Sequence, residues 1–180
     1  MPFELGALLS APFIFVAKRG EAAMATGLDD IDHRLLALLQ QDDRVPVAEL
    51  GKALGVPAST LNDRIRRLVK LGIVKGFHAH LDPEKVGLDL LAFVFIGWSD
   101  PGTEAKFLAA IAAAPEVQEA HHVTGAWNYL IKVRLRTTRD LEGFFAEVLK
   151  EVPGVQRTET LIVLSSPKDT TLVVPPKLKD

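Results

Sequence analysis

Hydrophobic residues recur at helical spacing along the first half of the chain. They form one stripe in each of three segments, 28–41, 46–54 and 57–71. A stripe of this period is typical of a helix with one buried face. Pro46 and Pro57 begin the second and third segments, where the missing N–H of proline has no helical partner to lose. With Gly55 between them, the pattern predicts three short helices and a tight glycine turn.

The second half of the chain follows a different pattern. A nearly continuous apolar run begins at Leu90 and predicts a strand buried on both faces, while strict alternation from Tyr129 predicts a strand with one buried face. Together with the capping box of Thr137 and Asp140, these patterns predict elements in the order β-α-β-β-α-β, at 90–98, 103–114, 117–124, 129–136, 137–149 and 155–164. This order is that of the ferredoxin-like fold.

The expected fold class is α+β, with an N-terminal winged helix-turn-helix domain and a C-terminal ferredoxin-like βαββαβ domain. The wing is expected as a short strand pair or extended segment over 73–81, and residues 171–174 are a candidate edge strand. The expected divisions are an N-terminal extension, the helical domain, a linker, the ferredoxin-like domain and a tail, at 1–27, 28–81, 82–89, 90–166 and 167–180.

The N-terminal extension has neither the length of a membrane span nor the charge order of a secretory signal. Its apolar stretch, 5–16, contains Pro12 and is roughly half of the ~20 residues that a span needs. Lys18 and Arg19 follow the apolar stretch, whereas a signal carries its positive charge before it. Two interpretations remain: translation begins at Met24, or the extension is a helix used in oligomer contacts.

The amino-acid composition excludes several kinds of chemical site, and the charges are unevenly distributed along the chain. The absence of cysteine excludes disulfides, thiolate zinc sites and cysteine nucleophiles, and it is compatible with the cytoplasm, where we expect the protein. The net charge is −2, but between Arg44 and Lys75 seven basic residues face two acidic ones, a local net charge of +5. The preceding helix is acidic, so we expect its charge to lie apart from this basic element.

The helix from Pro57 to Leu71 is therefore the candidate recognition helix for double-stranded DNA. Its first exposed residues are expected at base edges, because the N-terminus of such a helix enters the major groove: Ser59, Thr60, Asn62 and Asp63. Basic residues further on are expected at phosphates: Arg64, Arg67 and Lys75. Two alternatives stay open. The basic face can be an ordinary solvated surface of a three-helix bundle, and Arg64 can be half-buried against the first helix.

Five stretches together resemble the Lrp/AsnC family of regulators. They are LDDIDHRLLALLQQDDR, AEL followed by GVPASTLNDRIRRLVKLGIVKGF, LDPEKVGL, VQEAHHVTGAWNYLIKV and VPGVQRTETLIVLSSPK, and they span 28–168. The resemblance implies a winged helix-turn-helix that binds an operator, joined to a domain that binds a small-molecule effector, an amino acid above all. It also implies a homodimer, with octamers as a larger assembly, and no enzymatic activity, no cofactor and no membrane partner.

The resemblance also implies where the effector binds, and where this chain departs from the pattern. The site would lie between subunits and include His122, Thr124, Gly125, Asn128, Thr158 and Thr160. Asn128 stands where the family has an aspartate that would pair with the ammonium group of an amino acid, and asparagine offers only neutral hydrogen bonds. The alternative is that Gly125 simply permits a turn and that the two threonines are ordinary strand-forming residues. Near the helices, Pro46 and Pro57 replace serines, and Gly51 replaces an alanine so that two helices can approach closely.

The same residues allow other functions. Some sirohaem decarboxylases resemble this family across both domains, so a tetrapyrrole decarboxylase is the alternative function, with His121 and His122 in the relevant region. A sensor or assembly module that no longer binds DNA is a further alternative. We expect no metal site, since the chain has no cysteine and no carboxylate at ligand spacing from its histidines.

Overall fold

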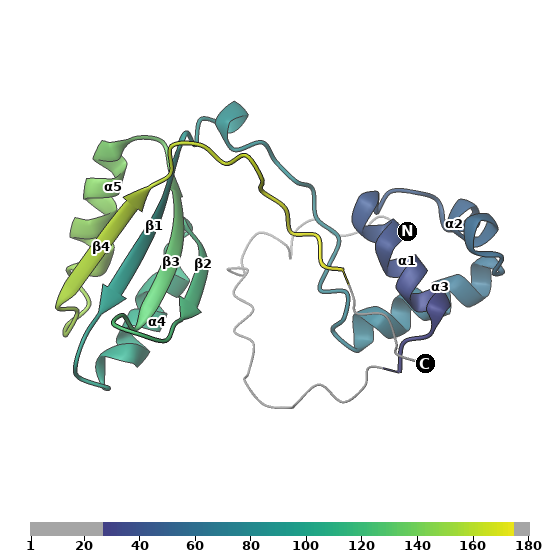
Figure 1. Ribbon diagram of the computed structural model, residues 1–180, viewed down its shortest axis with the longest axis horizontal. Helices are drawn as coiled ribbons and strands as arrows, with labels where there is room; N and C mark the ends of the chain where they lie inside the picture. The colour runs from purple at the N-terminus through teal and green to yellow at the C-terminus, as the bar shows by residue number, and fades with distance from the viewer. Residues whose placement is uncertain (1–26, 175–180) are drawn as a thin grey trace, which may run out of the picture. The chain divides into compact units, whose positions relative to one another are not determined.

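The computed structural model describes residues 27–174, and these form two compact units (Figure 1). Of the described residues, 27–80 and 168–174 form the helical unit, and 81–167 form the sheet unit. Both interpretations of the N-terminal extension concern residues outside the described range. The fold class predicted above is confirmed, although several local elements differ.

The helical unit contains α1 (Asp30–Gln41), α2 (Val47–Leu54) and α3 (Ala58–Lys70). At the start of α1, Asp29 and Asp32 form a capping box, in which each side chain accepts a hydrogen bond from the other residue's N–H. Pro46 and Pro57 precede α2 and α3 and make no side-chain cap. Leucines from all three helices, together with Leu28 just before α1, form the core; those of the helices are Leu35, Leu36, Leu50, Leu54, Leu61 and Leu68.

Two glycines shape the connection between α2 and α3. Gly55 takes the left-handed conformation at φ 70°, which ends α2. Gly51 lies in contact with the turn, because a Cβ atom built on it would stand 2.6 Å from the Val56 carbonyl oxygen. The close approach predicted for Gly51 is thus present, and it involves backbone atoms that cannot easily move aside.

Neither the strand pair, one of the two forms expected for the wing, nor the candidate edge strand of the tail forms among the described residues. No residue between Ile73 and Leu81 belongs to a strand, because the segment has no ladder partner and a strand cannot be completed without one. One residue of the tail, Val173, is hydrogen-bonded to α1 instead. The Gln40 side chain donates from Nε2 to the Val173 carbonyl oxygen (2.9 Å), and its Oε1 accepts from the Val173 N–H (2.8 Å). Gln40 therefore satisfies the backbone of one tail residue twice.

The sheet unit has the predicted order of elements. Its members are β1 (Leu90–Gly97), α4 (Thr103–Ala113), β2 (Val117–His122), β3 (Tyr129–Leu135), α5 (Thr138–Phe144) and β4 (Arg157–Ile162). A short 3-10 helix, η2 (Glu84–Val86), precedes β1, and a π-helical segment, η3 (Phe145–Leu149), prolongs α5. The strands form one antiparallel sheet in the order β2-β3-β1-β4.

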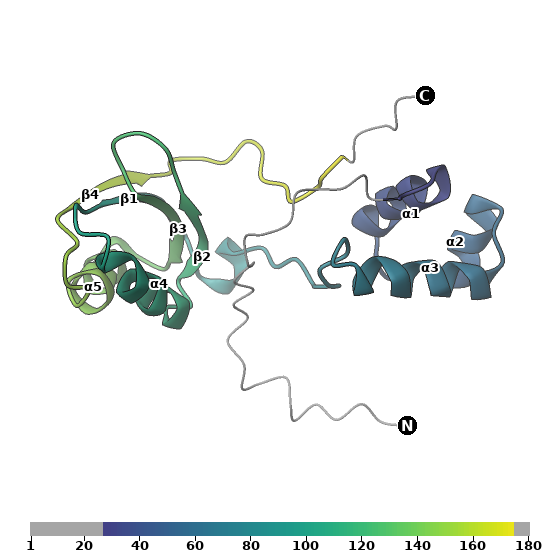
Figure 2. The ribbon, with the colours of Figure 1, turned by 90° about the horizontal axis from the view of Figure 1, so that it is seen from below.

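The two faces of the sheet have different surroundings. Figure 2 shows α4 and α5 on the same side of the sheet. Alternate β1 residues, Ala92, Val94 and Ile96, are fully buried in the core beneath these helices. The intervening residues Phe93 and Phe95 point to the opposite, helix-free face and are half-buried. The sheet therefore keeps an apolar surface on which neither α4 nor α5 packs.

Candidate DNA-binding surface and effector loop

The residues predicted at base edges share one exposed surface. Ser59, Thr60, Asn62 and Asp63 are all exposed in the N-terminal half of α3. Leu61 between them is fully buried and anchors this half of the helix to the core. Asp63 also lies 3.8 Å from Arg66, but both side chains are exposed, so this ion pair contributes little. The N-terminal half of α3 thus presents short polar side chains outward while Leu61 packs in the core.

A shallow depression of about 330 Å³ lies beside this surface. It is lined by residues of α3 and by the chain leading into α1: Gly27, Asp29, Thr60, Asp63, Arg64 and Arg67. Four of the seven residues predicted to contact DNA therefore line a single feature. Lys75 is exposed and lies beyond the end of α3, outside this lining.

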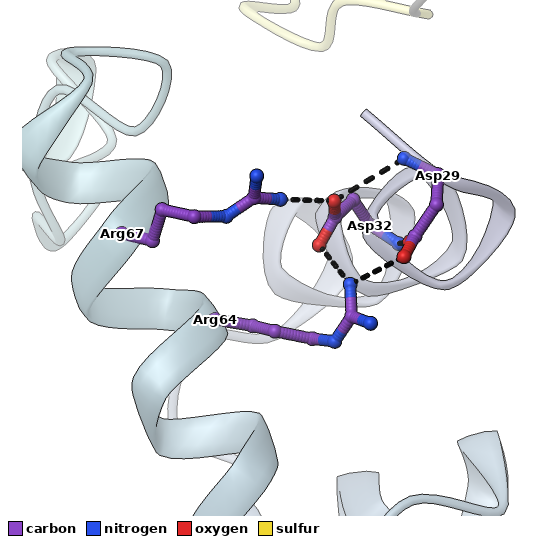
Figure 3. A network of polar contacts seen from close by, with 4 residues as sticks. All are labelled: Asp29, Asp32, Arg64 and Arg67. Carbon is purple, nitrogen blue, oxygen red and sulfur yellow. Dashed lines mark hydrogen bonds and ion pairs between the residues drawn. The ribbon is translucent and has the colours of Figure 1, made fainter. Parts of the chain in front are cut away.

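Two arginines of α3 contact the two aspartates at the start of α1. Figure 3 shows Arg64 and Arg67 reaching from α3 toward Asp29 and Asp32. Arg64 Nη1 donates to Asp29 Oδ2 (2.7 Å) and to Asp32 Oδ1 (2.8 Å), and Arg67 Nη2 donates to Asp32 Oδ2. These four residues, the arginine–aspartate network, join the two helices through charged hydrogen bonds.

The network corrects the expectation that acidic and basic charges lie apart. The sequence contained a signal for it, because Asp29 and Asp32 are three residues apart and so are Arg64 and Arg67. Side chains at this spacing share a helix face. What remained hidden was that these two faces meet in the folded unit.

The network also shifts two pKa values. The pKa of the Asp29 carboxyl lies below its ordinary value, chiefly because the carboxylate accepts a hydrogen bond from the Asp32 N–H and also because Arg64 lies beside it. Hydrogen bonds to Asp32 and then Asp29 raise the pKa of Arg64. Both shifts favour the charged forms. The alternative that Arg64 is partly buried against α1 agrees with its side-chain exposure of 23%.

The loop of residues 123–128, predicted above to bind the effector and called the effector loop below, is held on the end of β1. Asn128 donates its N–H to the Ile96 carbonyl oxygen (2.9 Å), and its side-chain Oδ1 accepts from the Trp98 N–H (2.8 Å). Gly125 has φ 103°, a conformation that favours glycine. The loop geometry is therefore fixed by Asn128 and permitted by Gly125.

The remaining predicted effector residues lie on the two outer strands. On β4, Thr158 is opposite Ile96 and Thr160 is opposite Val94, so both share the helix-covered face, as the period of two predicts. On β2, His122 is opposite Tyr129 and stacks on its ring with centroids 5.0 Å apart. Two strands separate His122 from the threonines, so the six residues do not form one cluster within a subunit.

Thr124 requires a correction. The strand expected to run to Thr124 ends at His122, so a shared strand face no longer relates these two residues. The following segment turns into the effector loop, where the Val123 N–H donates to the Asn128 carbonyl oxygen (3.1 Å). Thr124 is exposed within that turn.

Sequence reasoning missed one contact of the effector loop. The Arg157 guanidinium lies 4.4 Å from the centre of the Trp127 ring and donates to the Ala126 carbonyl oxygen. Gly97 makes room for this side chain, since a Cβ atom there would stand 2.6 Å from Arg157 Nε. Trp127 in turn contacts Phe95 on the helix-free face. The effector loop therefore contacts β4 as well as β1.

Between residues 27 and 174, no group of three or more histidine, cysteine, aspartate or glutamate side chains is arranged to hold a metal ion. No helix in this range is long and apolar enough to cross a membrane. His121, one of the candidate histidines, instead lies 3.2 Å from Glu119, which also binds Lys132.

Comparison with protein families gives two matches. Residues 28–75 match the family model described as winged helix-turn-helix DNA-binding, and residues 91–173 match the Lrp/AsnC ligand binding domain. The HTH-type transcriptional regulator FL11 of Pyrococcus horikoshii is 34% identical over 148 residues, 82% of this chain and 97% of the relative. The proline dehydrogenase transcriptional activator of Rhizobium radiobacter is 36% identical, over 79% of this chain and 94% of the relative.

Solved structures give the same result. Escherichia coli AsnC superposes with a TM-score of 0.76 at 30% identity and covers 81% of this chain and 97% of its own. A feast or famine regulatory protein of Mycobacterium tuberculosis, solved in complex with L-methionine, has a TM-score of 0.76 at 33% identity, with coverages of 82% and 99%. The named relatives are regulators rather than enzymes, which decides against the tetrapyrrole decarboxylase alternative.

Proposed function

The chain belongs to the Lrp/AsnC family of DNA-binding transcriptional regulators, and from this premise we propose that it binds a specific operator through α3 and adjusts that binding to a small-molecule effector. The single observation that carries the proposal is the exposed polar half of α3. It combines groups suited to base edges with arginines beside them.

The contacts with DNA are divided by chemistry. Ser59, Thr60, Asn62 and Asp63 are short side chains with donors and acceptors, and we assign them to base edges in the major groove. Arg67 and Lys75 are exposed cations, and we assign them to phosphates, which set the register of the protein on the duplex. The protein would act in the cytoplasm, where the chromosome of a bacterial or archaeal cell lies.

The helix-free face of the sheet supports assembly into a homodimer. Phe93 is flanked by Leu161 and Lys132 on the neighbouring strands, and Leu161 is 50% exposed. An apolar sheet surface of this kind is stabilised when a second copy covers it. A dimer would read two half-sites about one helical turn apart. Octamers are the larger assembly that we propose for higher protein concentrations.

The effector is proposed to be an amino acid that binds at the effector loop and β4. Two related structures are described as complexes with L-methionine, which supports this class of ligand. In this chain, Asn128 and Gly125 define the loop, while Thr158 and Thr160 offer hydroxyl groups on β4. Because these residues lie on different strands, we propose that the site is completed between subunits, with His122 and Thr124 near its edge.

Footprinting on the DNA upstream of the protein's own gene tests the proposal. We expect a protected region with two half-sites, whose boundaries or affinity change when one member of a panel of amino acids is added. Random duplex of equal length is the competitor. Equal affinity for random duplex and upstream DNA would refute operator specificity, whereas a footprint insensitive to the panel would refute only the effector class.

A further inference from the structure

Among residues 27–174, Asp32 is the only ionisable side chain that is fully buried. A buried carboxylate destabilises a fold unless hydrogen bonds and opposite charges compensate it. Asp32 has both. Its Oδ1 accepts from Arg64, and its Oδ2 accepts from Arg67 and from the Asp29 N–H at 3.3 Å. Such a pair rarely stabilises a fold more than apolar packing would, so its advantage lies in fixing one arrangement.

The arrangement that it fixes is the rotation of α3. Arg64 and Arg67 stand one turn apart on α3 and meet the two oxygens of a single carboxylate on α1. A slip of α3 by one residue would turn the helix by about 100° and break both contacts. The surface bearing Thr60 and Asp63 would rotate with it.

The two arginines differ in what they leave available. The Arg64 side chain is 23% exposed, and its Nε is buried without a hydrogen-bond partner in the described part of the chain. The Arg67 side chain is 43% exposed, and the contact with Asp32 uses Nη2. Arg67 can therefore present Nη1 and Nε outward while Asp32 holds the rest of the guanidinium.

We propose that Asp32 is a positioning residue for DNA binding, that Arg64 is an internal strut between α1 and α3, and that Arg67 alone of the pair contacts phosphate. Arg64, which the sequence placed among the phosphate contacts, is thus assigned instead to the contact between α1 and α3. This inference rests on the proposed function, in that α3 is taken as the helix that meets DNA. The arginine–aspartate network would hold Arg67 in position before DNA binds, so that less conformational entropy is lost on binding.

The rival explanation predicts the opposite sign. If the aspartates merely competed with phosphate for the arginines, neutralising Asp32 would free two cations and strengthen DNA binding. If Asp32 positions them, neutralising it loosens α3 and weakens binding. The direction of the change in affinity therefore separates the two explanations.

The experiment measures how the affinity of the full-length protein for a random duplex of fixed length depends on salt. Random duplex is the probe because phosphate contacts supply non-specific binding, so the result does not require that the operator be known. We expect Arg67→Gln to reduce the slope of log K against log salt by about 1 per site. Arg64→Gln should keep the wild-type slope. Asp32→Asn should weaken binding roughly threefold to tenfold at every salt concentration, the size of loosening one ordered side chain.

The control is Arg139→Gln, which removes an exposed arginine from α5 of the sheet unit and should change neither slope nor affinity. Tighter binding by Asp32→Asn, or an equal loss of slope in Arg64→Gln and Arg67→Gln, overturns the proposal.

If circular dichroism shows that Arg64→Gln or Asp32→Asn does not fold, the variant Arg64→Lys replaces it as the test. It keeps the charge but cannot bridge two carboxylates in the same way. Weaker binding at an unchanged slope supports the strut, and unchanged binding refutes it. Absence of any DNA binding by the wild type would instead refute the proposed function.

Discussion

Arg64 Nη1 lies 2.8 Å from Asp32 Oδ1, and this contact joins the middle of α3 to the first turn of α1 across the helical unit. The two residues are far apart in sequence, and the carboxylate is fully buried. Removing one partner of a buried pair costs about 3–5 kcal/mol, since the other charge is left uncompensated. The surface that we assign to DNA is therefore held by an ion pair beneath it.

Acid should weaken the helical unit through Asp29. Its folded-state pKa lies below the ordinary value of 3.8, so its contribution to stability is complete above that value and is lost as the pH falls below it. We expect the melting temperature to decline below about pH 4 less steeply in Asp29→Asn than in the wild type. Thermal melts between pH 3 and 6 measure this. Parallel declines in the two proteins would contradict it, and Asp43→Asn, at an exposed position in the turn after α1, is the control.

Gly51→Ala should destabilise the protein even though alanine favours helices. Alanine gains about 1 kcal/mol of helix propensity over glycine. Its Cβ, however, would stand 2.6 Å from the Val56 carbonyl oxygen, and such overpacking costs about 1–3 kcal/mol. The control is Gly143→Ala in α5, where an added Cβ meets nothing within 4 Å and should stabilise by about 0.5–1 kcal/mol. Urea denaturation of both variants measures the difference, and a stabilising Gly51→Ala would disprove the close approach.

Gly154→Ala should destabilise the sheet unit more than Gly125→Ala. Both glycines have positive φ, 100° and 103°, so alanine is strained at either position. At Gly154 the added Cβ would also overlap Oγ1 of the buried Thr103, whereas at Gly125 it meets nothing within 4 Å. We expect a cost of about 1–2 kcal/mol at Gly125 and at least 1 kcal/mol more at Gly154. Equal midpoints in urea would count against the overlap.

Gln40→Ala should release the tail from α1. The side chain of Gln40 both donates to and accepts from Val173, so its removal leaves that N–H open to water. Hydrogen exchange at Val173 should accelerate to the rate of an unprotected amide. The neighbouring Gln41→Ala is the control and should keep the protection. Because both residues are exposed, the melting temperature should hardly change in either variant.

Asn128→Asp should strengthen amino-acid binding if the effector loop holds the ligand. One carboxylate oxygen can keep the bond to the Trp98 N–H while the other accepts from an ammonium group. Charge-assisted hydrogen bonds are about twice as strong as neutral ones, so we expect roughly fivefold tighter binding by calorimetry. The 2-oxo acid with the same side chain lacks the ammonium group and should not gain. An equal gain for both ligands would place the ammonium group elsewhere.

The strands that failed to form show where local pattern is insufficient. The segments 73–81 and 171–174 have the composition of strands, yet the structure leaves both without a ladder partner. The predicted strands that did form all belong to one four-stranded sheet. A strand is completed by hydrogen bonds to another segment, and neither of the failed segments carries any indication of what that segment would be.

The helices, the capping boxes and the buried stripes were determined by the sequence alone, because each depends on residues within about one turn of one another. The order of elements in the sheet unit followed in the same way. Only the tertiary structure decided which charges meet. It placed Asp32 beneath Arg64 and Arg67, and it separated His122 from Thr158 by two strands. These relations join residues that are distant along the chain, and packing of whole helices and strands brings them together or holds them apart.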